Sequence, residues 1–216
     1  SGTLWLMCRI DRDFCRQHST MDLIRSRLQD DQSLPTDVWQ AIVELGWTGI
    51  TIPEAHGGLG LGFSELVPVV EAMGRHLMAT PLVSSALVAH ALTLAGSDQH
   101  KQRWLPQIAG GMIATLALLE PDGSWILEAP AATGEIRGGE LHLSGAKCFV
   151  QDAHLASLLL VSIVLDGEAR LVLLEKSRVP TSALVREIVI DDTRRCFQLC
   201  LDGITVPVEH LLPLTC

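Results

Sequence analysis

The residues of this sequence that could carry acid–base chemistry are carboxylates and histidines. Candidate carboxylates for proton transfer are Glu54, Glu71, Glu120 and Asp122. A general base must lie within hydrogen-bond reach of the proton that it removes, and spacing alone selects none of the four. The eight histidines are scattered, with no H-x-x-x-H or H-E-x-x-H pair, so their spacing indicates no metal site. His90 lies in an apolar stretch, where we expect a histidine of the core.

A glycine-rich stretch over residues 53–62 is the next candidate for chemistry, because glycine-rich loops can hold phosphates. The G-x-G-x-x-G spacing would need glycine at Phe63 or Glu65, and neither position has one. We therefore expect a tight loop whose glycines supply positive φ angles. No G-x-S-x-G motif occurs, which disfavours an α/β-hydrolase. The six cysteines include no C-x-x-C pair, a pattern typical of reduced thiols in a cytosolic protein.

Composition narrows the function classes further. The 216 residues carry 16 Lys plus Arg against 25 Asp plus Glu, a formal net charge of −9. Nucleic-acid surfaces need clustered basic residues, so we expect no nucleic-acid partner. The longest apolar stretches are about half of the roughly 20 residues that a membrane-spanning helix needs, so we expect no membrane span. The first residues lack the basic region of a signal peptide, and we expect a cytoplasmic protein.

The elements that must position these residues change in character near residue 113. Before it, apolar residues recur at helical spacing, which predicts an all-α domain over residues 1–113. One helix begins near Thr36 and ends at Gly46, and another begins with Ser64 as its N-terminal cap. A buried helix follows Pro81, and a fourth helix begins at Ser97.

After residue 113 the pattern predicts strands. The stretches 114–119, 158–165 and 169–174 are apolar runs, and residues 140–144 alternate between apolar and polar types. Glycine turns at 137–140 and at Asp166-Gly167 indicate hairpins. We therefore predict an α+β fold, in which the helical domain precedes an antiparallel β-sandwich or barrel over residues 114–216. Without a low-complexity linker, the two domains are expected to pack directly.

Several short motifs occur in a fixed order along the chain. They are LGWTGI at 45–50, PE-x-x-GG-x-GLG at 53–62, EAMGR at 71–75, Q-x-WLP-x-IA-x-G at 102–111, ALLEP at 117–121, LSGAK-x-FV at 143–150 and DGI-x-VP at 202–207. This ordered set resembles the acyl-CoA dehydrogenase family of flavoproteins, from about Leu34 to Pro213. Each motif alone is weak, whereas the order of all of them is specific.

The resemblance implies an FAD-dependent oxidoreductase that acts on an acyl-CoA thioester. In the family, a glutamate removes the proton α to the thioester carbonyl, and the β-hydrogen leaves as hydride to the flavin, giving a trans-2-enoyl-CoA. Family members continue into a second helical domain that carries the glutamate in most of them. The catalytic base is therefore expected beyond Cys216, and neither Glu54 nor Glu120 takes that role.

The resemblance also assigns binding residues. The implied cofactor-binding residues are Leu116, Leu118, Leu119, Phe149, Val150 and Gln151, and the implied residues at the acyl-CoA thioester are Gly123 and Ser124. Two positions depart from the family pattern, because Leu119 replaces a threonine and Gln151 replaces a threonine or serine. Two lost hydroxyl contacts at about 1 kcal/mol each would weaken flavin binding tens of times. The stretch around Ser124 is also one residue shorter than the common form.

Three functional hypotheses follow from the resemblance. The leading one is FAD-dependent α,β-dehydrogenation of an acyl-CoA in fatty acid or lipid metabolism, and we expect this chain alone to be incomplete for that reaction. Its implied partners are acyl-CoA dehydrogenase-type subunits in a homo- or hetero-oligomer, and an acceptor such as electron-transfer flavoprotein. The alternative is a non-catalytic subunit or fragment that pairs with an active homologue. The third is an acyl-CoA oxidase or a related flavin monooxygenase on the same scaffold.

Overall fold

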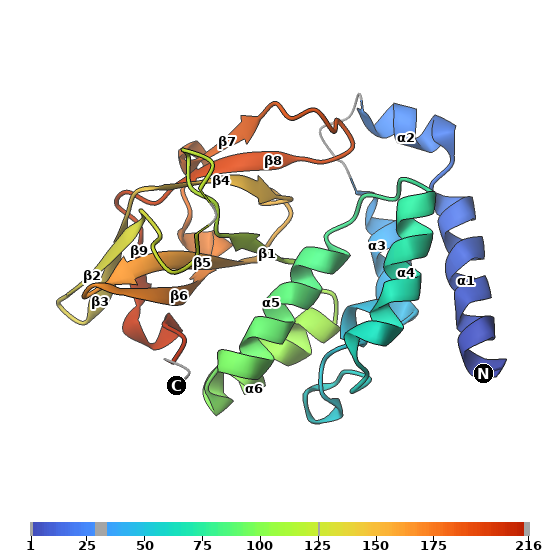
Figure 1. The fold of residues 1–216 in the computed structure, drawn as a ribbon, viewed down its shortest axis with the longest axis horizontal. Helices are drawn as coiled ribbons and strands as arrows, with labels where there is room; N and C mark the ends of the chain where they lie inside the picture. Colours follow the sequence, from blue (N-terminus) through green and yellow to red (C-terminus); the bar gives the residue numbers. More distant parts are fainter. Residues whose placement is uncertain (1, 29–33, 125, 214–216) are drawn as a thin grey trace.

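The chain forms a group of helices followed by two β-sheets (Figure 1). The computed structural model describes residues 2–28, 34–124 and 126–213, and their side chains from Ile10 onward. The helices are α1 (Gly2–His18), α2 (Met21–Leu28), α3 (Thr36–Glu44), α4 (Phe63–Arg75), α5 (Leu82–Ala95) and α6 (Asp98–Ala109). The strands are β1 (Ala114–Ala117), β2 (Thr133–Arg137), β3 (Glu140–Ser144), β4 (Ala146–Gln151), β5 (Leu158–Leu165), β6 (Glu168–Glu175), β7 (Leu184–Glu187), β8 (Cys196–Cys200) and β9 (Thr205–Pro207). Among the described helices, none has both the length and the apolar character needed to cross a membrane.

Local capping chemistry explains the start of α6 and the end of α3. Ser97 caps α6, because its hydroxyl accepts a hydrogen bond from the amide of His100 at 3.2 Å. Gly46 follows α3 with φ of 76°, a left-handed conformation that suits glycine after a helix. The expected cap at Ser64 is wrong. Helix α4 begins at Phe63, and the Ser64 hydroxyl instead donates to the Glu65 carboxylate at 2.7 Å.

The glycine-rich stretch after α3 is a tight loop, as predicted. Gly57 and Gly60 have φ of 81° and 64°, a region that side chains other than glycine rarely adopt. A Cβ at Gly58 would lie 2.1 Å from the carbonyl oxygen of Ile52. The loop closes on itself because the Leu59 amide donates to the carbonyl of Gly49 at 2.8 Å. Its glycines therefore serve the backbone, Gly57 through its positive φ and Gly58 through close packing.

The strands form one large sheet, in the order β1-β5-β2-β3-β9 with β6 also paired to β5, and a smaller sheet, β4-β8-β7. The two predicted hairpins, β2–β3 and β5–β6, are antiparallel as expected. The sheets are mostly antiparallel, but β1 pairs with β5 in parallel, from Ala114 opposite Leu158 to Ala117 opposite Val161. Parallel pairing requires a long crossover connection, which the intervening strands β2 to β4 provide. The chain changes sheets between β8 and β9.

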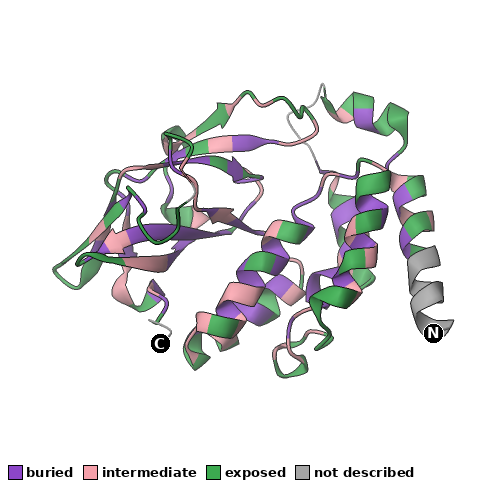
Figure 2. Cartoon of the chain, in the orientation of Figure 1, coloured by how far each residue is buried: buried purple, intermediate pink, exposed green. Residues whose placement is uncertain are grey.

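The helices and the sheets share a core, so the two halves pack directly against each other. One cluster of buried side chains joins Leu105 and Ile108 of α6 with Leu158 and Leu160 of β5. Separate clusters fill the inside of the helical group and the space between the two sheets. Figure 2 shows buried positions along α5 and the strands beside it. Continuous apolar packing of this kind fixes β1 and β5 relative to the helices.

Candidate functional site

The two segments implied to face the flavin meet at the end of β1. Leu119 forms an isolated antiparallel bridge with Cys148, whose amide donates to the carbonyl of Leu119 at 3.0 Å. Farther along, the hydroxyl of Thr115 donates to the carbonyl of Gln151 at 2.6 Å. Strand β1 belongs to the large sheet and β4 to the small one. The predicted residues are therefore brought together where the two sheets join.

A β-bulge in β4 turns Phe149 outward. The register between β4 and β8 shifts between Lys147 and Val150, so β4 carries an extra residue there. Phe149 has φ of 50° and is 46% exposed, which is unusual for a bulky residue. Its amide donates to the carboxylate of Glu187 on β7 at 2.6 Å. The bulge thus presents an aromatic ring to the outside beside the end of β1.

The other implied cofactor residues differ in their exposure. Val150 is fully buried in the core between the sheets, so its side chain cannot contact a ligand. Leu116, Leu118 and Leu119 are half-buried, and Gln151 is exposed. Of the six implied residues, Phe149 and Gln151 are therefore the most accessible to a planar ligand, and the three leucines are accessible only in part.

Gly123 and Ser124 lie in an ordered turn that directly follows this region. The amide of Glu120 donates to the carbonyl of Ser124 at 2.9 Å, and the amide of Gly123 donates back to the carbonyl of Glu120 at 2.9 Å. Gly123 has φ of 83°, as a glycine in such a turn permits. The carboxylate of Asp122 accepts from the Ser124 amide at 2.8 Å. Residue 125 of the same segment lies outside the described residues.

Beneath this surface lies a buried ion pair between Lys147 of β4 and Glu120. Lys147 is fully buried, and its Nζ contacts Glu120 Oε1 and donates to the Ser162 hydroxyl at 2.9 Å. Glu120 Oε1 also accepts from the amide of Ala131 at 3.0 Å, while Glu120 Oε2 is buried and without a hydrogen-bond partner. Burial lowers the pKa of Lys147, and the adjacent Glu120 carboxylate opposes that shift.

The remaining carboxylates considered for proton transfer lie apart from this region. Glu71 pairs with Arg75 on the exposed surface of α4, with Nη2 and Oε1 2.6 Å apart. Glu54 lies in the exposed glycine-rich loop. His90 is half-buried rather than fully in the core, and its ring packs edge-on against Phe63 at 4.8 Å between centroids. Within the part of the chain that the structure describes, no group of three His, Cys, Asp or Glu residues could hold a metal ion.

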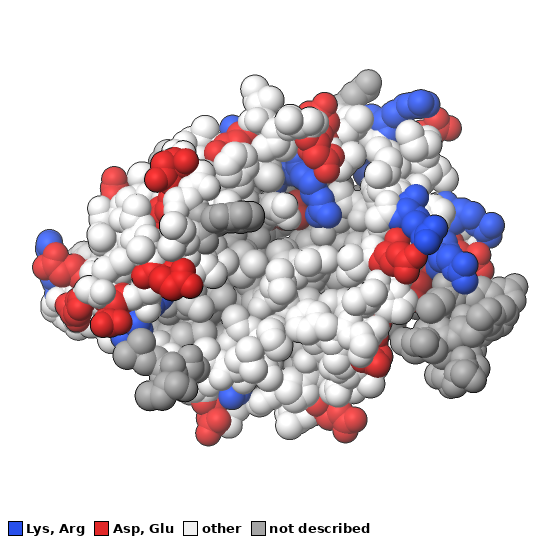
Figure 3. Space-filling view, in the orientation of Figure 1, with Lys and Arg blue, Asp and Glu red and all other residues white. Residues whose placement is uncertain are grey.

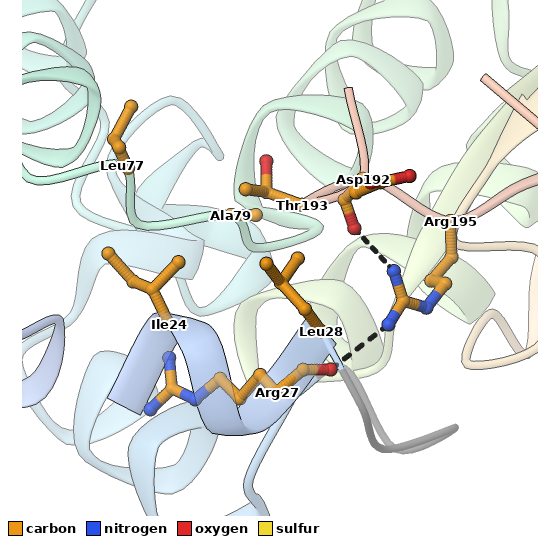
Figure 4. A pocket seen from close by; sticks show the side chains of 8 residues that line it. All are labelled: Ile24, Arg27, Leu28, Leu77, Ala79, Asp192, Thr193 and Arg195. Carbon is orange, nitrogen blue, oxygen red and sulfur yellow. Dashed lines mark hydrogen bonds between the residues drawn. The ribbon is translucent and has the colours of Figure 1, made fainter. Parts of the chain in front are cut away.

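A separate small cavity lies between α2 and the segment before β8 (Figure 4). Arg195 spans it, because its guanidinium donates to the carbonyl of Asp192 at 2.6 Å and to the carbonyl of Arg27 at 3.0 Å. The second of these bonds joins the segment before β8 to the C-terminal end of α2. The cavity is lined by Ile24, Arg27, Leu28, Leu77, Ala79, Asp192, Thr193 and Arg195. Since Arg195 donates to backbone carbonyls, this region is a contact between the two halves of the fold.

The outer face of α4 and α5 is apolar. Figure 3 shows a broad uncharged area in the region where Figure 1 places α5 and the strands beside it. Val67 is 60% exposed, and Leu87 is 40% exposed. Together with Phe63, Leu66, Val70, Val83 and one charged residue, Glu71, they line a shallow groove between α4 and α5. Exposed apolar patches occur at contacts with other proteins, with ligands or with membranes.

Sequence reasoning missed the buried ion pair, although both of its residues were visible. Lys147 is one of three lysines in the chain, and it stands in a strand whose neighbours are apolar. The available signal was a lysine with apolar residues on both sides, together with a glutamate at the end of an apolar run.

The cysteines are free thiols where the structure describes them. Cys15, Cys148 and Cys196 are buried and Cys200 is exposed, whereas Cys8 and Cys216 lie outside the described side chains.

Comparison with known proteins identifies the family. Residues 11–112 match the acyl-CoA dehydrogenase N-terminal domain. Acyl-CoA dehydrogenase FadE12 of Mycobacterium tuberculosis is 30% identical over 187 residues, which are 82% of this chain and 48% of that protein. A variant of the steroid ACAD Tcur3481-Tcur3483 superposes with a TM-score of 0.84 and 27% identity, over 98% of this chain and 57% of that one.

Solved structures with lower sequence identity share the same fold. An acyl-CoA dehydrogenase from Bacillus anthracis, complexed with FAD, has a TM-score of 0.82 at 20% identity, over 99% of this chain and 38% of that one. The chain spans about half the length of the curated relatives it matches. Because the N-terminal domain match, the 30% identical relative and the superposed structures all name the same kind of protein, the chain belongs to the acyl-CoA dehydrogenase family.

Proposed function

We propose that this chain is the flavin-facing half of an FAD-dependent acyl-CoA dehydrogenase. The proposed reaction is α,β-dehydrogenation of an acyl-CoA thioester in fatty acid or lipid metabolism. The observation that carries the proposal is the junction of β1 and β4, where a bulge exposes Phe149 beside the half-buried Leu118 and Leu119. We propose the same division of the chain as the sequence predicts, with a helical domain over residues 1–113 and a β-domain over residues 114–216.

The residues at this junction fit a flavin in part. An exposed aromatic ring flanked by leucines suits the apolar body of a flavin, because planar ring systems stack on aromatic side chains. The amide of Gln151 can both donate and accept hydrogen bonds, but it replaces a hydroxyl, and Leu119 offers none. We propose that Leu116, Leu118, Leu119, Phe149, Val150 and Gln151 line the flavin, with Val150 contributing only its backbone.

The chain's own residues would then bind and orient the reactants. A bound flavin supplies the hydride acceptor. Phe149 would cover one face of the ring and keep water away, while Gly123 and Ser124, held by their turn, would lie at the thioester end of the acyl-CoA. The proton acceptor would come from the portion of the relatives' length that this chain does not span. Glu120 does not serve, because it is buried against Lys147.

Reconstitution with FAD tests this proposal. Purified protein should bind FAD, seen as a flavin absorbance band that remains after gel filtration and as a saturable change in flavin fluorescence. Phe149→Ala should weaken binding by about tenfold, since a stacked aromatic contact contributes about 0.5–1.5 kcal/mol beyond its buried area. Val67→Ala on α4, far from the junction, is the matched control and should leave the affinity unchanged. A protein that stays colourless after incubation with FAD contradicts the flavin assignment.

A second candidate function is a non-catalytic subunit that pairs with an active homologue. It is favoured by Leu119 and Gln151, which remove two hydroxyl groups from the proposed flavin surface, and by the apolar groove that includes Val67 and Leu87. Copurification with an acyl-CoA dehydrogenase-type subunit, together with FAD bound only by the complex, would support it. A monodisperse monomer that binds FAD alone would exclude it.

The proposed function extends to a cellular compartment, an electron acceptor and an oligomeric assembly. The buried free thiols Cys15, Cys148 and Cys196 favour a reducing compartment, and we propose the cytoplasm. The proposed electron acceptor is an electron-transfer flavoprotein or a similar protein, and the assembly is a homo- or hetero-oligomer. Oxygen consumption by the completed enzyme with an acyl-CoA, without an added acceptor, would instead indicate an oxidase or a flavin monooxygenase.

A further inference from the structure

The buried pair of Lys147 and Glu120 connects every segment that the proposed function places against a ligand. Glu120 directly follows Leu119 on the flavin side and begins the turn that holds Gly123 and Ser124 on the thioester side. Lys147 lies two residues before Phe149 in the bulged strand. No other described lysine is fully buried, since Lys101 and Lys176 are both partly exposed.

The contacts of this pair reach four different parts of the backbone. Lys147 Nζ contacts Glu120 Oε1 and donates to the Ser162 hydroxyl at 2.9 Å. That hydroxyl in turn donates to the carbonyl of Leu118 at 3.3 Å. Glu120 Oε1 accepts from the Ala131 amide at 3.0 Å. The ammonium group of Lys147 thus joins β4 to β5 and to Glu120, and the Glu120 carboxylate extends the network to the segment before β2.

A second set of contacts ties the bulge to the same glutamate. The thiol of Cys148 donates to the carbonyl of Glu120 at 2.8 Å, and the Cys148 amide donates to the carbonyl of Leu119. The bulge holds Phe149 at φ of 50°, a conformation that persists only where the surroundings enforce it. A buried charge pair is weak evidence for stability, because desolvation offsets its attraction. Its position beneath a bulge points to a role in geometry.

We propose that Lys147 is a positioning residue, which holds the Leu118–Leu119 segment and the Phe149 bulge in the geometry that binds flavin. This inference rests on the proposed function and deepens it. Lys147 touches no ligand itself, since it is fully buried. It acts by fixing Glu120 and Ser162, and through them the backbone on both sides of the junction.

A double variant that removes both charges of the Lys147–Glu120 pair separates a positioning role from a contribution to the stability of the whole fold. Lys147→Met alone leaves Glu120 buried without its cation, so it should destabilise the fold strongly. The double variant Lys147→Met with Glu120→Gln removes both charges and keeps an acceptor for the Ala131 amide, so its thermal midpoint should return toward that of the wild type. Positioning predicts that this double variant still binds FAD about fivefold more weakly, the loss expected for one hydrogen bond. Lys101→Met on α6 is the matched control and should leave FAD affinity unchanged.

Amide hydrogen exchange gives a second readout that needs no flavin. The Cys148 amide should exchange about tenfold faster in the double variant, because its partner strand is no longer fixed. FAD affinity and Cys148 exchange both equal to wild type would overturn the positioning role. If the wild-type protein binds no FAD, the proposed function fails, and the exchange rate alone then decides: faster exchange supports the structural part of the inference, and unchanged exchange refutes it.

Discussion

Asp152, at the end of β4, is a buried carboxylate whose ionisation the fold opposes. It is 6% exposed, and burial raises its pKa from 3.8 to about 6, although Arg194 and Arg195 act in the opposite direction. Because the pKa in the folded state is above that in the unfolded chain, the folded state binds the proton more tightly. Stability should therefore fall as pH rises from about 4 to about 6, and the loss is complete above that window.

Replacing Asp152 with asparagine mimics the protonated form and should remove this cost. A pKa raised from 3.8 to about 6 corresponds to about 3 kcal/mol at pH 8, at 1.36 kcal/mol per pKa unit, and to about half of that at pH 5. Asp152→Asn should gain up to those amounts in free energy of unfolding. The backbone tolerates the change, because Asp152 has φ of 53° and asparagine accepts that region.

Urea unfolding at pH 5 and at pH 8 measures the effect. The matched control is Asp166→Asn, since Asp166 has φ of 52° but lies exposed in the turn between β5 and β6. The control should change stability by less than about 0.5 kcal/mol at both pH values. The reasoning is refuted if Asp152→Asn is no more stable than the wild type at pH 8, because attraction to Arg194 and Arg195 would then outweigh burial.

Two further predictions concern the loop and the flavin surface. Gly58→Ala should lower the free energy of unfolding by about 2 kcal/mol or more, since its Cβ would lie 2.1 Å from the Ile52 carbonyl oxygen. Gly57→Ala, with φ of 81° and no atom within 4 Å, should lose only about 1 kcal/mol, and equal losses in thermal unfolding would contradict this account. Leu119→Thr and Gln151→Thr should each raise FAD affinity about fivefold in a fluorescence titration by restoring a hydroxyl. Affinity that does not change in either variant would show that backbone contacts dominate.

The sequence predicted those parts of the fold that depend on neighbouring residues. Ser97 marks the start of α6, Gly46 follows the end of α3, and Asp166-Gly167 forms the turn between β5 and β6. Each of these signals acts within a few residues, through a cap or a turn. Ser64 shows the limit of such signals, because the carboxylate of Glu65 accepts from the amide of Gly62 at 3.0 Å and makes that glycine the cap. Helix α4 consequently begins one residue earlier than its apparent cap.

Pairing between distant segments was not predictable from one sequence. The apolar run that contains Leu116 indicates a strand, but nothing in it specifies a parallel partner in β5. The bulge at Phe149 adds a residue to β4, which breaks the alternation that would have placed Lys147 and Cys148 on opposite faces. Both side chains are buried. The most consequential feature of the candidate site was therefore the one that simple periodicity assigns incorrectly.

Two of the departures that the resemblance implies, Leu119 and Gln151, change side chains and leave backbone pairing in place. Leu119 pairs with Cys148, and the backbone carbonyl of Gln151 accepts a hydrogen bond from Thr115. A leucine at the bridge keeps the backbone in place while it removes one hydrogen-bonding group. Flavin affinity should therefore depend on how far backbone groups and the exposed ring of Phe149 compensate for the missing hydroxyls. The hydroxyl-restoring variants measure this directly, since they change those groups and leave the bridge unaltered.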